Sequence, residues 1–201
     1  MSNTLLLTKL FPPTVHSGLV SRPRLVGRVL DGWRQGRKLA LFSAPPGFGK
    51  TTLVGEVIQL AGCRTAWLSI DSADNAPVRF WRYIIAAMRR LFPDLGELAQ
   101  SMLEANQPPP VENILTSLLN ELAVLPEPLI IILDDYHLIE TTAVHESLNF
   151  FIDHLSPQVS LIITTRSDPP LSLARRRGRM EMTEIRAADL RFSYNEAVEF
   201  L

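Results

Sequence analysis

Short apolar runs alternate with amphipathic segments along most of this 201-residue chain. The apolar runs predict strands over residues 39–43, 65–70, 129–133 and 160–164, with a weaker fifth strand over 180–185. The spacing of apolar residues between them predicts helices over 24–34, 50–60, 77–91, 111–124 and 141–155. Strands that are apolar along their whole length and are separated by helices are typical of a parallel sheet covered on both faces. We therefore expect a doubly wound α/β fold, a three-layer αβα sandwich around a mainly parallel five-stranded sheet.

A glycine-rich segment joins the first predicted strand to the helix after it, with the sequence Ala44-Pro45-Pro46-Gly47-Phe48-Gly49-Lys50-Thr51-Thr52. A strand before this pattern and a helix behind it are the context that a P-loop requires, so the fold is expected to be that of a P-loop NTPase. In such a loop, backbone N–H groups and the positive end of a helix dipole hold the phosphates of a nucleotide. We expect these nine residues to bind ATP or ADP, with Lys50 at the β- and γ-phosphates and the Thr51 hydroxyl on Mg²⁺. The alternative is a coincidental Gly-Lys-Thr at a helix start.

Charged side chains follow two other predicted strands. Asp134 and Asp135 come directly after the apolar run 129–133, and Arg166 follows the run 160–164. Ligands of open α/β sheets bind at the carboxyl edge of the strands, so these residues should meet the P-loop there. Asp134 would then hold Mg²⁺, Asp135 would activate the attacking water, and Arg166 would sense the γ-phosphate. The alternatives are solvated turn aspartates and an arginine paired with a surface carboxylate.

The composition excludes several classes of function. Twenty Lys and Arg residues against 21 Asp and Glu residues give a net charge of −1, which argues against a domain built to grip nucleic acid or an anionic membrane. The single cysteine, Cys63, excludes a disulfide framework and a cysteine-ligated zinc site, and the four histidines lack metal-ligand spacing. The apolar runs are far shorter than the roughly 20 residues of a membrane span, and the N-terminus lacks a secretory signal. We expect a cytoplasmic protein with no membrane partner.

Two polar clusters leave alternatives open. Asp71, Asp74 and Asn75 follow the second predicted strand, and are either supporting groups of the phosphate site or turn formers. The four arginines within residues 175–179 are either a nucleic-acid contact or, as we expect, a solvated face or an ion-pairing surface.

The end of the chain predicts the start of a further helix. Ser193 and Glu196 have the spacing of a capping box, and Val198 and Leu201 are placed as if to face a core. Because the sequence stops about two turns into this helix, we expect it to be a fragment of a longer protein.

Several stretches together resemble the nucleotide-binding domain of STAND-class ATPases, and most closely that of large MalT-like regulators of the LuxR type. They are TKLFPP (8–13), LVSRPRL (19–25), SAPPGFGKTT (43–52), WLSID (67–71), DNAPVRF (74–80), LDDYHL (133–138), TTRSDPP (164–170) and ADLRF (188–192), followed by Glu196-Ala197. The P-loop alone would identify only a superfamily, whereas the LDDYHL and ADLRF stretches point to a much narrower group of proteins.

This resemblance implies an ATP-dependent switch that is monomeric with ADP and self-associates with ATP and an inducer. It implies that Val20, Arg22 and Pro23 lie near the adenine. It also implies three parts: a lead-in over residues 1–38 with this adenine-side segment, a P-loop nucleotide-binding domain over 39–190, and the start of a helical lid over 191–201. DNA would be bound only by a C-terminal domain that these residues do not include.

Three functional hypotheses follow. The first is an ATP-binding and slowly ATP-hydrolysing switch module of a signal-transducing transcriptional regulator. We expect slow hydrolysis because Asp135 is a methylene shorter than the glutamate that many ATPases place there. The second is a constitutive P-loop ATPase or phosphotransferase. A phosphotransferase needs an acceptor pocket and usually arginine-bearing lid residues, and we identify neither. The third is a nucleotide-binding scaffold without turnover.

Overall fold

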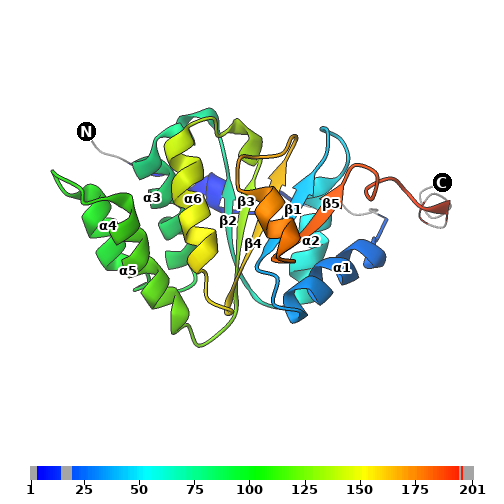
Figure 1. The fold of residues 1–201 in the computed structure, drawn as a ribbon, viewed down its shortest axis with the longest axis horizontal. Helices are drawn as coiled ribbons and strands as arrows, with labels where there is room; N and C mark the ends of the chain where they lie inside the picture. The colour runs from blue at the N-terminus through cyan, green and yellow to red at the C-terminus, as the bar shows by residue number, and fades with distance from the viewer. Residues whose placement is uncertain (1–3, 15–19, 195, 197–201) are drawn as a thin grey trace.

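The computed structural model describes residues 4–14, 20–194 and 196. A five-stranded sheet lies at its centre, with the strands in the order β2-β3-β4-β1-β5 and every neighbouring pair parallel (Figure 1). The strands are β1 (Leu39–Ser43), β2 (Arg64–Ser69), β3 (Leu129–Asp134), β4 (Val159–Thr165) and β5 (Met182–Arg186). The predicted α/β fold with a five-stranded sheet is confirmed, and all of the strand pairs are parallel.

Helices cover both faces of this sheet and so complete three layers (Figure 1). On one face lie α1 (Pro23–Arg34) and α2 (Lys50–Ala61), and on the other lie α3 (Pro77–Arg89), α5 (Val111–Ala123) and α6 (Thr142–His154). The short helix α4 (Glu97–Glu104) packs on α5, and α7 (Leu173–Gly178) precedes β5. Three 3-10 turns complete the described structure: η1 (Leu7–Leu10), η2 (Ser72–Asn75) and η3 (Tyr136–Leu138). Among the described residues, no helix combines the length and apolar character needed to cross a bilayer.

The two helical layers explain why the three inner strands, β1, β3 and β4, are apolar along most of their length. Successive side chains of a strand point to opposite faces of the sheet. In β1, Leu39 and Leu41 belong to the core beneath α3, α5 and α6, whereas Ala40 and Phe42 belong to the core beneath α1 and α2. A strand between two such cores has no solvent-facing side and carries no polar alternation.

The predicted elements agree with the observed ones to within two residues at each end, but α4 and α7 were not predicted. Helix α4 begins after Gly96, whose φ of 72° favours glycine, and buries only Ala99 and Leu103. Helix α7 spans six residues, three of which are arginines. Neither has the long apolar stripe by which a helix is found from sequence.

The capping box predicted near the end of the chain is present. The backbone N–H of Ser193 donates to Glu196 Oε2 (2.7 Å), and the N–H of Glu196 donates to Ser193 Oγ (3.3 Å). Val198 and Leu201, which were predicted to face a core in the following helix, lie outside the described residues.

Candidate nucleotide-binding site

The register of the sheet brings distant segments to one edge. Ser43 at the end of β1 is level with Thr165 of β4, and Ser69 at the end of β2 is level with Asp134 of β3. The segments that follow these strands therefore leave the sheet on the same side. Asp134, Asp135 and Arg166 are thereby brought to the loop that joins β1 to α2.

Two glycines shape that loop. Gly47 (φ 81°) and Gly49 (φ 74°) have left-handed backbones, which L-residues with a Cβ adopt only with strain. Gly49 is also the N-cap of α2, so the helix begins at Lys50 with its first N–H groups directed away from its own turns. These N–H groups and the helix dipole make the N-terminus of α2 favourable for an anion.

A hollow of about 200 Å³ lies in front of this helix end. It is lined by Pro46, Gly47, Gly49, Lys50, Thr51, Thr52, Asp135 and Arg166. The structure thus brings the glycine-rich loop together with the aspartate that follows β3 and the arginine that follows β4. Asp134 lies just behind this hollow and reaches it through Thr51.

The Lys50 ammonium is held within the loop. It is buried and donates to the carbonyl oxygens of Ala44 (2.8 Å) and Pro45 (3.0 Å). Burial holds the pKa of Lys50 below its ordinary value, the Asp135 carboxylate acts in the opposite direction, and the Arg166 guanidinium adds to the lowering. A cation that is partly desolvated in this way interacts strongly with an incoming phosphate.

Thr51 and Asp134 form the pair that fits a magnesium ion. The Thr51 hydroxyl donates to Asp134 at 3.1 Å from Oδ1 and 3.3 Å from Oδ2, across 83 residues of sequence. Burial raises the pKa of Asp134, and the hydrogen bonds from Thr164 and Thr51 oppose this rise. Among the described residues, no group of three or more His, Cys, Asp or Glu side chains could hold a metal by itself. One hydroxyl and one carboxylate suit Mg²⁺, which takes oxygen ligands and shares its shell with phosphates and waters.

Thr164 joins the two aspartates, and the sequence analysis gave it no separate role. Its buried hydroxyl donates to Asp134 Oδ1 (2.5 Å) and accepts from the backbone N–H of Asp135 (2.9 Å). Asp135 itself has a left-handed backbone (φ 60°), and its carboxylate is half exposed at the hollow. The position of Thr164 at the end of β4, two residues before Arg166, was the available signal for its role.

His137 is a second neighbour of Asp135 that sequence reasoning missed. Its Nδ1 lies 3.7 Å from Asp135 Oδ1, and within the described part of the chain neither ring nitrogen has a hydrogen-bond partner, although both are buried. Burial and the Arg166 guanidinium lower the pKa of His137, and the Asp135 carboxylate opposes this lowering.

The segment expected near the adenine borders a second hollow. This cavity of about 410 Å³ is lined by Val20 and Arg22, and it shares Gly47, Gly49 and Thr52 with the first. Pro23, which was expected in the same place, begins α1 and lines a separate hollow along that helix.

The other wall of this second hollow comes from the opposite end of the chain. Leu190, Arg191 and Phe192 line it, and the Arg22 guanidinium lies over the Phe192 ring at 4.3 Å from its centroid. The Glu56 carboxylate of α2 accepts from the backbone N–H of Arg22, at 2.9 Å from Oε1 and 3.0 Å from Oε2. An aromatic ring beside apolar side chains suits a nucleobase. The sequence signal was the stretch 188–192, which had no assigned role.

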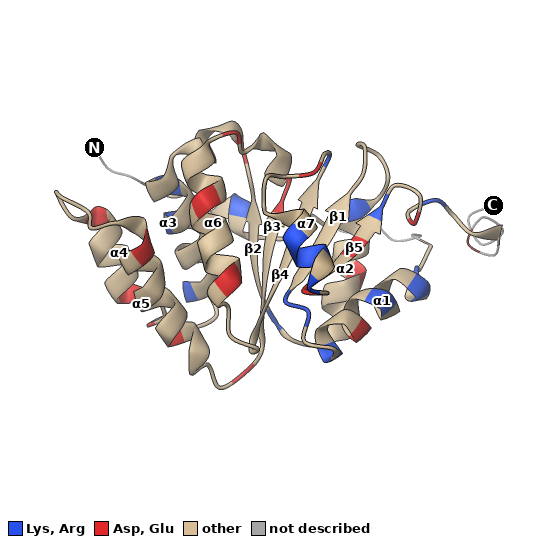
Figure 2. Ribbon diagram, viewed as in Figure 1, with Lys and Arg blue, Asp and Glu red and all other residues tan. Residues whose placement is uncertain are grey.

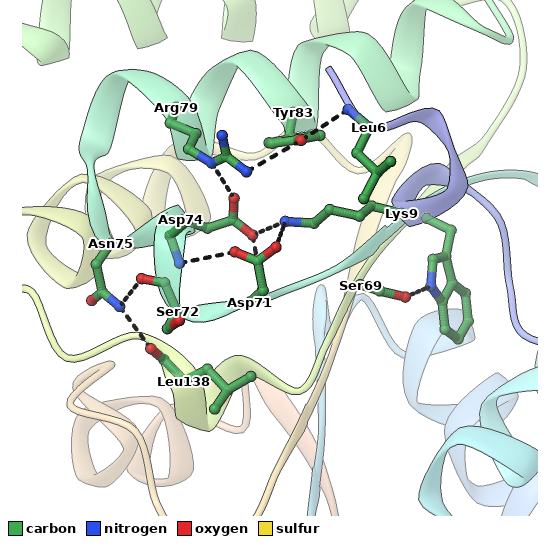
Figure 3. Close-up of polar contacts among 12 residues, drawn as sticks. Leu6, Lys9, Ser69, Asp71, Ser72, Asp74, Asn75, Arg79, Tyr83 and Leu138 are labelled. Carbon is green, nitrogen blue, oxygen red and sulfur yellow. Dashed lines mark hydrogen bonds and ion pairs between the residues drawn. The ribbon is translucent and has the colours of Figure 1, made fainter. Parts of the chain in front are cut away.

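The acidic residues after β2 lie apart from both hollows. Asp74 is fully buried and forms ion pairs with Lys9 and Arg79, and Asp71 also pairs with Lys9 (Figure 3). Asp71 and Asp74 therefore anchor η1 beside β2. Asn75 forms hydrogen bonds to the segment after Asp135.

The arginines of 175–179 form ion pairs, as expected. Arg175 and Arg176 pair with Asp153, and Arg177 pairs with Asp168 and Glu184. These arginines form the blue part of α7 in Figure 2. Guanidinium groups that are paired with carboxylates do not form the net positive patch that is typical of a nucleic-acid-binding surface.

Comparisons with known proteins agree with this geometry. The model of the ATPase family associated with various cellular activities (AAA) matches residues 40–186. The HTH-type transcriptional regulator MalT of Cronobacter sakazakii is 34% identical over 198 residues, which are 98% of this chain and 21% of that protein. The chain thus spans about a fifth of this relative, and the resemblance to MalT-like regulators is confirmed.

Solved structures show the same fold. Cdc6p from Pyrobaculum aerophilum aligns with a TM-score of 0.57 at 18% identity, covering 90% of this chain and 49% of that one. A Walker-type ATPase of Pyrococcus abyssi aligns with a TM-score of 0.52 at 16% identity, covering 97% and 60%. The family implies the use of a nucleotide and typically of Mg²⁺. The P-loop fold is confirmed, and this chain belongs to the AAA family of ATPases.

Proposed function

We propose that this chain is the ATP-binding and slowly ATP-hydrolysing switch module of a signal-transducing transcriptional regulator. One observation carries the ATPase part: a glycine-shaped helix N-terminus, the buried Lys50 ammonium and the Thr51–Asp134 pair surround one hollow, which Asp135 and Arg166 also line. The regulator part is supported by the 34% identity to MalT, which extends over almost the whole chain.

Each residue has a proposed role in this reaction. Lys50 neutralises the β- and γ-phosphates, and the loop N–H groups, those of Gly47 and Gly49 included, hold the phosphate oxygens. Asp135 orients the attacking water and accepts its proton, while Arg166 stabilises the charge that develops on the γ-phosphate. Mg²⁺, held by Thr51 and Asp134, supplies further charge neutralisation when bound.

The base and ribose would occupy the second hollow. Val20, Arg22 and Phe192 line it, and it shares Gly47, Gly49 and Thr52 with the phosphate hollow. A nucleotide lying across both hollows would contact Val20 and Arg22 of the adenine-side segment and also residues 190–192. Such a bridge between distant segments suits a switch, because the nucleotide state changes what holds them together.

Binding is tested with Lys50→Ala. A charge-assisted bond is worth roughly 1.5–3 kcal/mol, so the affinity for a labelled ATP analogue should fall at least about tenfold. Lys38→Ala is the matched control, because Lys38 lies at the opposite end of β1 and donates to the Leu155 carbonyl oxygen. Equal affinities of the two variants would contradict the assignment of the phosphate site.

Turnover is tested by phosphate release from the wild type and from Asp135→Asn. We expect slow release that Asp135→Asn abolishes, with the affinity for ATP retained. Rapid release without any inducer would indicate the constitutive ATPase. If ATP binds but no phosphate is released, both by this chain and by the intact regulator proposed here, the protein would be a nucleotide-binding scaffold. Because Asp135 has a short reach, this scaffold is the stronger of the two alternatives to the switch. Self-association of the intact regulator with ATP and not with ADP is the expected mark of the switch.

A further inference from the structure

Asn75 joins the turn after β2 to the segment that follows Asp135. Its Nδ2 donates to the carbonyl oxygens of Ser72 (3.0 Å) and Leu138 (2.8 Å), as Figure 3 shows. Its Oδ1 accepts from the backbone N–H groups of Glu140 (2.7 Å) and Thr141 (3.0 Å), and from the Thr141 hydroxyl (3.0 Å). One amide side chain thus makes five hydrogen bonds, four of them to residues 138–141.

The segment that Asn75 grips is the turn that Asp135 opens. The Leu138 N–H donates to the Asp135 carbonyl oxygen (3.1 Å), and the Ile139 N–H donates to that of Tyr136 (3.0 Å). Leu138 is therefore bonded through its N–H to Asp135 and through its carbonyl oxygen to Asn75. This makes a chain of two hydrogen bonds from the Asn75 amide to the backbone of Asp135.

Asp135 needs such support because its backbone is left-handed (φ 60°). This conformation is costly for a residue with a Cβ and persists where the surrounding structure over-determines it. On one side, the Asp135 N–H is held by the Thr164 hydroxyl. On the other side, the turn through Leu138 is held by Asn75. Both contacts hold the backbone from which the Asp135 side chain reaches the hollow.

The turn that carries Asn75 is itself held in place. Asn75 is the last residue of η2, which Asp71 and Asp74 cap reciprocally. Asp74 is fully buried between Lys9 and Arg79 (Figure 3). A side chain mounted on a turn held by buried ion pairs can fix a neighbouring loop, because its own backbone has little freedom.

We propose that Asn75 is a positioning residue for Asp135 in the ATP hydrolysis proposed above, on which this inference rests. It acts through the Leu138 carbonyl oxygen and keeps the Asp135 carboxylate turned toward the γ-phosphate side of the hollow. It does not touch the nucleotide, so its loss affects the hydrolytic step and leaves binding intact.

The experiment compares Asn75→Ala and Asn75→Asp with the wild type by single-turnover phosphate release and by titration with a labelled ATP analogue. For Asn75→Ala, we expect the hydrolysis rate to fall about tenfold or more, with the affinity unchanged within about twofold. Asn75→Asp keeps the three accepted bonds but cannot donate to the Leu138 carbonyl oxygen. It should therefore lose hydrolysis as Asn75→Ala does. Hydrogen exchange at the Leu138 amide should rise in both variants.

Asn149→Ala is the matched control. Asn149 also bridges two segments, since its Nδ2 donates to the Pro170 carbonyl oxygen (3.1 Å) and its Oδ1 accepts from Arg176 (3.2 Å). We expect it to lower the free energy of unfolding with no change in the rate of hydrolysis.

Three results would overturn the positioning role of Asn75 while leaving the proposed function in place. The first two are wild-type hydrolysis in Asn75→Ala and wild-type hydrolysis in Asn75→Asp. Equal losses of hydrolysis in Asn75→Ala and Asn149→Ala would also overturn it, because the loss would then reflect general destabilisation. If the wild type releases no phosphate, the proposed hydrolysis fails, and the role of Asn75 fails with it.

Discussion

Replacing Thr164 by valine removes the hydroxyl that holds both strand-end aspartates and leaves the shape of the side chain nearly unchanged. The lost bond to the Asp134 carboxylate is charge-assisted and worth about 1.5–3 kcal/mol. The Asp135 N–H loses its partner as well, at a cost of about 1–3 kcal/mol. Because contributions at one site are not additive, we expect the free energy of unfolding to fall by about 3 kcal/mol.

Urea unfolding of Thr164→Val measures this loss, and Thr165→Val is its control. Thr165 is the next residue of the same strand and equally buried, but its hydroxyl donates only to the neutral carbonyl oxygen of the exposed Ser167 (2.7 Å). That bond is worth about 1 kcal/mol. Equal losses for the two valine variants would refute the reasoning that Thr164 supports a pair of functional groups.

Three further perturbations test the packing, the charge state and the ion pairs of the fold. Gly32→Ala places a Cβ 2.1 Å from the Thr183 hydroxyl, so the protein should lose about 1–3 kcal/mol of stability in thermal denaturation. Burial lowers the pKa of His145, so below about pH 6.5 the unfolded chain binds more protons than the folded one; the urea midpoint should therefore fall as the pH drops from 7 to 5. Lys9→Met leaves the buried Asp74 with one cation fewer and should cost about 3 kcal/mol in urea unfolding.

Each of these three perturbations has a control variant that is measured in the same assay. Gly27→Ala lies in the same helix as Gly32 with nothing near its Cβ, and should stabilise the protein by up to about 1 kcal/mol. His145→Gln should reduce the pH dependence. Arg34→Met breaks an exposed pair and should cost less than about 0.5 kcal/mol. A loss from Arg34→Met as large as that from Lys9→Met, or a pH dependence unaltered in His145→Gln, would contradict the respective argument.

The sheet and the phosphate loop were predictable because their signals are local. A strand buried on both faces is apolar at each position, and a left-handed loop at a helix start requires glycine, as at Gly47 and Gly49. The wall that Leu190 and Phe192 add to the second hollow was not predictable, because Arg22 meets these residues from the far end of the chain. The pairing of Lys9 with Asp74 was hidden for the same reason, since 65 residues separate them.

The amino-acid sequence by itself determined the class of fold, the glycine-rich loop and the charged residues placed at the strand ends, since each follows from the periodicity or conformational preference of neighbouring residues. Only the tertiary structure decided the strand order β2-β3-β4-β1-β5, and with it which strand ends adjoin. It also decided that Thr164 holds Asp134 and Asp135, that His137 lies beside the hollow, and that Asn75 grips the turn after β3. The physical reason is that these contacts join segments whose proximity depends on how buried faces pack across the whole sheet, which no local window of sequence contains.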